Sequence, residues 1–351
     1  MIGERQRRFV ELAGQPVAPP IQAAIVRLAE AHDYARNTQC DLWEFAVEMN
    51  ALTAIGLLCD DLRWLVTNGY PISQSAPIIT IIQAANHQFT EVTMRLLAFG
   101  VAMLIGVNAA NAAVQTKVVE YKQGNAVLEG YLAWDDAVQG QRPGVLVVHE
   151  WTGLGDYAKV RARKLAEMGY VAFAIDIYGK GIRPKTPQEA AAQSGIYKKD
   201  RALLRARAQA GLDVLRGNSM CDCKRVAAIG YCFGGTCVLE LARSGTDIAS
   251  VVSFHGGLDT PTPADAKNIR CKVLVLHGGD DPHVPRKDVD AFEDEMRAGG
   301  VDWQLVIYGG AVHGFTNPAS GNDKSRGAAY NAQADWRSWE AMKAFFAEVL
   351  K

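Results

Sequence analysis

Short apolar runs alternate with segments of helical periodicity from about residue 116 to the C-terminus. The apolar runs are typical of strands buried on both faces, and they occupy residues 145–148, 171–175, 225–229, 249–254, 272–276 and 303–308. Apolar residues recur at helical spacing over residues 157–168, 198–215, 235–243, 287–298 and 333–349. Two further runs, 117–121 and 127–134, predict a hairpin ahead of the first parallel strand. This order predicts an α/β fold with a mostly parallel, doubly wound sheet.

A nucleophilic side chain lies at the turn between the predicted strand 225–229 and the following helix. The turn reads Gly230-Tyr231-Cys232-Phe233-Gly234-Gly235, and its glycines suit a place where the strand and helix backbones approach closely. This is the pattern of the nucleophile elbow of an α/β-hydrolase, with cysteine in place of the usual serine. A thiol at a helix N-terminus lies against the positive end of the helix dipole, which favours the thiolate. Cys232 is therefore the predicted nucleophile.

An acid and a histidine follow Cys232 in the order that this fold requires. Asp281 comes just after the predicted strand 272–276, and His313 follows the predicted strand 303–308. Loops after parallel strands meet at the carboxyl edge of the sheet, where such sites form. We expect Asp281 to orient and stabilise the imidazole, His313 to accept the thiol proton and Cys232 to attack a carbonyl carbon.

Neighbouring residues leave alternatives for two of these roles. Asp280 is the alternative acid, and His277 and His283 are the alternative bases. His277 ends a predicted strand, which favours a packing role for its ring. His255 also follows a predicted strand, and we expect it to line the site at most.

Four segments together resemble the dienelactone hydrolase family, from about Val118 to the C-terminus. They are His149-Glu150-Trp151 after the first parallel strand, the elbow at 230–235, Asp281-Pro282-His283-Val284-Pro285 and Val312-His313-Gly314-Phe315. The elbow with cysteine is the most specific of the four. The resemblance implies an α/β-hydrolase without a metal or organic cofactor, which cleaves a lactone or ester through a thioester acyl-enzyme.

The resemblance also assigns supporting residues. In this family a glutamate at the place of Glu150 pairs with the resting cysteine and is displaced when substrate binds. Two backbone N–H groups would form the oxyanion hole, one on Phe233 and the other on Trp151. Members that hydrolyse dienelactone hold the substrate carboxylate with arginines, one of them four residues after the catalytic histidine. Here that position is Asn317, so a neutral ester or a different lactone is an open alternative.

The segment from Tyr178 to Tyr197 is the predicted wall of the substrate pocket, because loops after strands decide specificity in such sheets. Tyr178, Tyr197, Trp151 and Phe315 are the candidates for apolar contacts with the substrate. Two other functions fit the same residues. One is a general carboxylesterase or thioesterase with a wide apolar pocket, and the other is a non-catalytic thiol sensor or binding module. The intact order of nucleophile, acid and base favours an enzyme.

Composition supports an ordinary soluble enzyme, and the resemblance implies a small-molecule ester or lactone substrate. We expect a monomer or small homo-oligomer. The 351 residues are 49% hydrophobic and 21% charged, which is enough to bury a full α/β core. The formal net charge of −1 gives no indication of a nucleic-acid partner. The seven cysteines have no zinc-site spacing. Cys221, Cys223, Cys237 and Cys271 are either free thiols or, in an exported protein, paired.

Residues 94–113 have the pattern of a secretory signal peptide lying inside the chain. Met94-Arg95 is a short positive start, the apolar stretch 96–107 is too short for a comfortable membrane span, and Ala110-Asn111-Ala112 fits the cleavage rule. If translation starts at Met94, the hydrolase domain at 114–351 is periplasmic or secreted. Otherwise the enzyme is cytoplasmic and 94–113 is a buried helix between two domains. Residues 1–93 would then be a small helical segment of unknown role, without a basic recognition helix for DNA.

Overall fold

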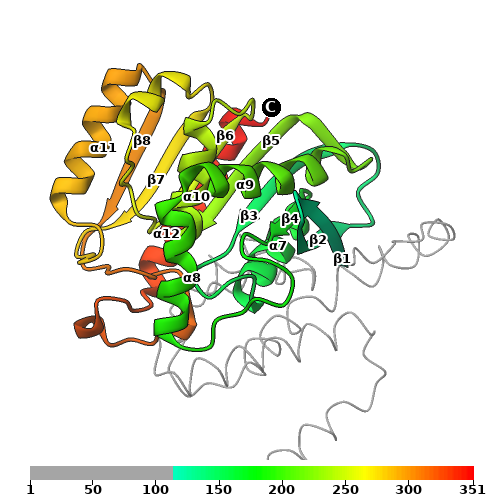
Figure 1. Ribbon diagram of the computed structural model, residues 1–351. Coiled ribbons are helices and arrows are strands. Elements are labelled where there is room, and N and C mark those ends of the chain that lie inside the picture. The colour runs from blue at the N-terminus through cyan, green and yellow to red at the C-terminus, as the bar shows by residue number, and fades with distance from the viewer. Residues whose placement is uncertain (1–113) are drawn as a thin grey trace, which may run out of the picture. The chain divides into compact units, whose positions relative to one another are not determined.

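Eight strands form one sheet in the computed structural model, which describes residues 114–351. They are β1 (Val114–Gln123), β2 (Ala126–Asp135), β3 (Arg142–Val148), β4 (Val171–Ile175), β5 (Cys221–Tyr231), β6 (Ser250–Phe254), β7 (Lys272–Gly278) and β8 (Trp303–Tyr308). Across the sheet their order is β1-β2-β4-β3-β5-β6-β7-β8, from the teal edge to the orange edge of Figure 1. β2 is antiparallel to both β1 and β4, and all other neighbours are parallel. The predicted α/β fold is confirmed.

Helices cover both faces of this sheet (Figure 1). The six longest are α7 (Asp156–Glu167), α8 (Pro187–Lys199), α9 (Arg201–Arg216), α10 (Phe233–Arg243), α11 (Arg286–Gly299) and α12 (Ala332–Val349). Val145 and Val147 of β3 pack with α7 and α12, whereas Leu146 and Val148 pack with α9 and α10. Each such side chain contributes about 1.5–3 kcal/mol by leaving water. Burial on both faces explains why the strands are continuous apolar runs.

The prediction of one helix over 198–215 is wrong at its first residues, because α8 ends and α9 begins there. α8 begins after Thr186, whose side chain accepts a hydrogen bond from Glu189 N, and Pro187 takes the first helical position. Asp200 ends α8 and caps α9, since its carboxylate accepts the N–H of Leu203 at 2.9 Å. The segment predicted as a pocket wall is therefore largely helical.

A buried arginine ties α10 to α11. The Arg243 side chain is fully buried and lies 3.0 Å from Oε1 of Glu240 and 2.7 Å from Oε2 of Glu295. It also donates a 3.0 Å hydrogen bond to the carbonyl oxygen of Leu258, in the loop after β6. Since both carboxylates are nearly or fully buried, the one guanidinium compensates charges that water does not reach.

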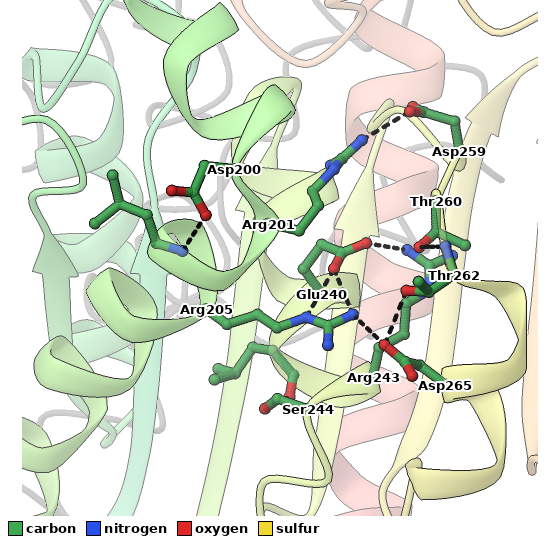
Figure 2. Close-up of polar contacts among 12 residues, drawn as sticks. Asp200, Arg201, Arg205, Glu240, Arg243, Ser244, Asp259, Thr260, Thr262 and Asp265 are labelled. Atoms are coloured by element: carbon green, nitrogen blue, oxygen red, sulfur yellow. Dashed lines mark hydrogen bonds and ion pairs between the residues drawn. The ribbon is translucent and has the colours of Figure 1, made fainter.

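Two arginines of α9 extend this network (Figure 2). Arg205 Nη2 lies 2.8 Å from Oε2 of Glu240 and 2.8 Å from Oδ2 of Asp265, so it bridges α10 and the segment after β6. Arg201, at the beginning of α9, reaches Asp259 at 2.7 Å. The ion pairs fix α9, α10 and the loop after β6 relative to one another.

The predictions for 1–93 and for the signal-like segment 94–113 fall outside the described residues. From residue 114 onward, no helix has both the length and the apolar character that a bilayer crossing requires. The cysteines of this part of the chain are free thiols, which settles the alternative left open for Cys221, Cys223, Cys237 and Cys271.

Candidate active site

Cys232 lies between β5 and α10 in a backbone conformation that residues with side chains rarely adopt. Its φ is 54° and its ψ is −116°, and such a conformation costs on the order of 1–3 kcal/mol. The Cys232 N–H points to two acceptors, the carbonyl oxygen of Phe254 at 3.0 Å and Nδ1 of His255 at 3.1 Å. The strained turn leaves the thiol partly exposed at a cavity instead of packed in the core.

The two glycines around Cys232 are needed for space. A Cβ at Gly230 would overlap the carbonyl group of Gly234, and a Cβ at Gly234 would overlap the carbonyl oxygen of Val148. Neither glycine has a positive φ. The close approach of β5, α10 and β3 therefore excludes side chains here, as the sequence pattern predicts for an elbow.

Asp281 and His313 are joined by a hydrogen bond at the carboxyl edge of the sheet. His313 Nδ1 lies 2.8 Å from Asp281 Oδ2, and Asp281 Oδ1 accepts the N–H of His283 at 2.8 Å. Burial alone would raise the pKa of the Asp281 carboxyl, but the hydrogen bond and charge of His313, with the His283 N–H, bring it below its ordinary value. The ionised carboxylate only accepts, so Nδ1 of His313 carries a proton and Nε2 is left for another partner.

Cys232 is that partner. Burial opposes the charged imidazolium of His313, but the charge and hydrogen bond of the Cys232 sulfur, together with Asp281, outweigh it and raise the pKa of His313 to about 10. The Cys232 sulfur and the Asp281 carboxylate thus act on the same imidazole.

The alternative acid and bases lie elsewhere. Asp280 is exposed, and the contact with His313 is made by Asp281. His277 is buried, and its Nδ1 has no hydrogen-bond partner among residues 114–351. The exposed His283 ring lies 5.2 Å from the His313 ring, centroid to centroid, and belongs to the cavity wall.

The loop after β3 is held by a buried histidine, His149, to which the sequence analysis gave no role. His149 donates from Nδ1 to the carbonyl oxygen of Glu150 at 2.6 Å and accepts the Ile177 N–H at Nε2, 3.2 Å away. Both ring nitrogens are therefore used by a neutral ring, and burial lowers its pKa to about 4. His149 fixes the backbone from which Glu150 and Trp151 reach the cavity.

Glu150 differs from the expectation that the family resemblance gave. Its Oε2 accepts a 2.6 Å hydrogen bond from Nδ2 of Asn317 and has no hydrogen bond with the Cys232 thiol in the described structure. The physical reason is that an amide N–H is a much stronger donor than a thiol. Burial raises the pKa of the Glu150 carboxyl, and the Asn317 hydrogen bond and the charge of His313 oppose this rise.

The two residues expected to supply the oxyanion hole lie at the cavity. Phe233 is the first residue of α10, so its N–H has no acceptor within the helix. Trp151 is 37% exposed in the loop after β3. Both residues line the same cavity as Cys232.

This cavity has a volume of about 500 Å³. Its wall combines Glu150, Trp151, Cys232, Phe233, His313 and Asn317 with Ser194 and Lys198 of α8. The expectation that Tyr178, Tyr197 and Phe315 line the pocket is wrong: all three are buried outside the lining. Tyr178 stacks on Tyr197, which lies on the buried face of α8, and Phe315 packs against His255.

Known proteins resemble this chain over the same region. The model of the dienelactone hydrolase family matches residues 128–350. A solved structure titled m3DLH is 43% identical, with a TM-score of 0.66 over 68% of this chain and 100% of that one. A dienelactone hydrolase-like promiscuous phosphotriesterase from metagenomic libraries is 42% identical, with a TM-score of 0.65 and the same coverage. A protein of Aquifex aeolicus (strain VF5) named "Putative carboxymethylenebutenolidase" is 27% identical over 67% of this chain and 99% of its own length.

Proposed function

Since this chain belongs to the dienelactone hydrolase family, we propose that it hydrolyses a lactone or carboxylic ester with Cys232, His313 and Asp281 as its catalytic triad. One observation carries the proposal. His313 lies between the Asp281 carboxylate, 2.8 Å away, and the Cys232 sulfur, at a cavity large enough for a small-molecule acyl compound. The order of the three residues along the chain is that of the α/β-hydrolases.

The reaction has two steps on these groups. The Cys232 sulfur attacks the carbonyl carbon, and the alcohol oxygen leaves with the proton of the His313 imidazolium, which gives a thioester. A water molecule then gives a proton to His313 and attacks the thioester carbon, which releases the acid and regenerates the thiolate. In each step the N–H groups of Phe233 and Trp151 would stabilise the negative oxygen of the tetrahedral intermediate.

Glu150 has a supporting role in this proposal. Its Oε2 accepts the amide N–H of Asn317, whereas Cys232 pairs with His313 in the resting enzyme. A free carboxylate beside the sulfur would oppose the thiolate. Glu150 therefore acts on the site by its charge and by its place in the cavity wall.

The acyl compound can be neutral or anionic, and two residues bear on the choice. Asn317 replaces the arginine that dienelactone-hydrolysing members use for a substrate carboxylate, and its amide is already bound to Glu150. Lys198 of α8 lines the cavity and has no ion pair with any residue from 114 onward, so its ammonium group is free to meet an anionic substrate. We propose Lys198 as the anion-binding group.

Hydrolysis of a substrate panel by the purified full chain tests the function. The panel holds short 4-nitrophenyl esters, neutral lactones, dienelactone and an aryl dialkyl phosphate, the last because a 42% identical neighbour is titled a phosphotriesterase. Cys232→Ala should lose at least about 1000-fold in kcat. Cys223→Ala removes an exposed thiol outside the cavity and should keep wild-type rates. Wild-type activity of Cys232→Ala would overturn the assignment of the nucleophile.

A further inference from the structure

Two residues other than glycine have a positive φ between residues 114 and 351, and they are hydrogen-bonded to each other. Cys232 has φ 54° and His255 has φ 40°. The N–H of Cys232 donates to Nδ1 of His255 at 3.1 Å. Strained backbone of this kind persists only where the surroundings determine it, and it concentrates at functional sites.

The hydrogen bonds of His255 define its tautomer. A backbone N–H can only donate, so Nδ1 is the unprotonated nitrogen and the proton lies on Nε2. Nε2 is 2.7 Å from Oγ1 of Thr316, which accepts this proton. The ring is fully buried, and burial, followed by the charges of His313 and Arg161, keeps its pKa well below the ordinary value. His255 therefore stays neutral and uses both nitrogens.

Thr316 anchors the other end of this contact. It lies three residues after His313. Its hydroxyl accepts a 2.6 Å hydrogen bond from the hydroxyl of Tyr157, and its carbonyl oxygen accepts one of 2.8 Å from Arg161. Arg161 is in turn paired with Asp335 of α12. One line of polar contacts thus runs from the elbow, through the loop of the base, to α7 and α12.

We propose that His255 is a positioning residue, which ties the backbone of Cys232 to the loop of His313 through Thr316 and so holds nucleophile and base in line. The inference rests on the proposed roles of Cys232 and His313. His255 is not among the cavity-lining residues, so it acts through its neighbours and not on the substrate. The His255 ring also packs against Phe315, with 5.0 Å between the ring centroids. A residue that served only in packing would not need hydrogen bonds at both ring nitrogens.

Thr316→Val tests the proposal with the least disturbance, because it keeps the shape of the side chain and removes only the hydroxyl. His255→Asn is the second variant, since asparagine tolerates a positive φ, places an acceptor near the position of Nδ1 and has no donor near the position of Nε2. Thr316→Ser restores the hydroxyl and serves as the matched control. All are made in the full chain, and kcat, KM and the melting temperature are measured together.

Alkylation of Cys232 by iodoacetamide gives a readout that does not depend on any substrate. Its rate at pH 6 relative to pH 9 reports how closely the sulfur pairs with His313, and peptide mapping separates it from Cys223, an exposed thiol that serves as internal reference. The groups around His255 that titrate or carry charge are Cys232, His313, Tyr157, Arg161 and Tyr231. Tyr157, Tyr231 and Arg161 keep their charge state over this range because the pKa of each lies above its ordinary value, so the ratio reports on the contact between Cys232 and His313.

We expect Thr316→Val to lower kcat by about 10- to 100-fold with KM within about twofold, and to lower the pH 6 to pH 9 alkylation ratio of Cys232 about tenfold. His255→Asn should do the same, and Thr316→Ser should recover most of the loss. A lower melting temperature with wild-type kcat and alkylation ratio in both variants would overturn the proposal. If Cys232→Ala keeps wild-type turnover, the proposed function fails, and the alkylation ratio alone still decides the positioning role.

Discussion

Asn317 donates a 2.6 Å hydrogen bond from Nδ2 to Oε2 of Glu150, and this bond joins the loop after His313 to the loop after β3. The side chain that replaces the expected arginine therefore binds a carboxylate of the protein. The amide also lowers the pKa of a carboxyl group whose pKa burial raises. Apart from burial, this contact is the largest influence on whether the Glu150 carboxyl is neutral or ionised.

Replacing Asn317 by leucine should shift Glu150 toward its protonated form. The burial that raises the pKa of the carboxyl remains, whereas the hydrogen bond that lowers it is lost. Infrared difference spectra against Glu150→Gln at pH 7 should show a stronger band of protonated carboxyl in Asn317→Leu than in the wild type. Equal bands would mean that Asn317 does not control the charge of Glu150.

Removing the Cys232 sulfur should lower the pKa of His313. Apart from burial, which acts in the opposite direction, the Cys232 charge is the largest influence on this imidazole, and it raises the pKa to about 10. In Cys232→Ala the His313 ring should titrate at least one pH unit lower than in the wild type, as followed by NMR of the labelled histidine. An unchanged titration would show that the two groups do not form an ion pair.

The pH dependence of turnover should reveal the role of Asp281. The imidazolium of His313 is present below its pKa and lost above it, so wild-type kcat should fall as the pH rises through about 10. Asp281 also raises this pKa, so Asp281→Asn should move the alkaline limb to lower pH and reduce kcat by about 10²- to 10⁴-fold. Asp280→Asn is the control, because the Asp280 carboxylate is exposed. If only Asp280→Asn lost activity, Asp280 and not Asp281 would be the acid of the triad.

Lys198→Met should discriminate between anionic and neutral substrates. Without the ammonium group, the KM for dienelactone should rise about tenfold, while the KM for a neutral ester stays within about twofold. Lys199→Met removes the neighbouring charge of the same helix, which does not line the cavity, and provides the comparison. Equal changes for both substrates would exclude Lys198 as the anion-binding group.

Arg243→Leu should destabilise the fold by about 3–5 kcal/mol, because it leaves Glu295 buried without a compensating cation and Glu240 with Arg205 alone. The matched control is Arg297→Ala in α11, whose partner Glu293 is partly exposed, with an expected loss of under about 1 kcal/mol. Urea unfolding of the full chain measures both. Similar losses of unfolding free energy in the two variants would show that burial of the ion pair does not determine its contribution to stability.

The sequence predicts the strands and the elbow well because both depend on local chemistry. Strands buried on both faces must be apolar throughout, and the tight turn at Gly230 and Gly234 excludes side chains. α8 escapes prediction because its alanine-rich, polar sequence has little apolar periodicity. As a result Tyr178, predicted at a loop surface, is buried, and Tyr197 lies on the buried face of that helix.

Contacts between loops could not be predicted from local sequence patterns. The hydrogen bond between Asn317 and Glu150 spans 167 positions along the chain, and that between Thr316 and His255 spans 61. Each depends on how two irregular segments end at the same edge of the sheet. The only signal in the sequence is that His255, like His313, follows a strand.

Asp200 separates α8, which lines the cavity, from α9, which packs on the sheet. α9 carries the arginines of the buried network and packs on the sheet, whereas the 13-residue α8 contributes Ser194 and Lys198 to the cavity. Selection for a new acyl compound can therefore act on one short helix while the scaffold below it stays unchanged. In directed evolution, we expect substitutions at the exposed Lys198 to change substrate preference with little effect on the buried network.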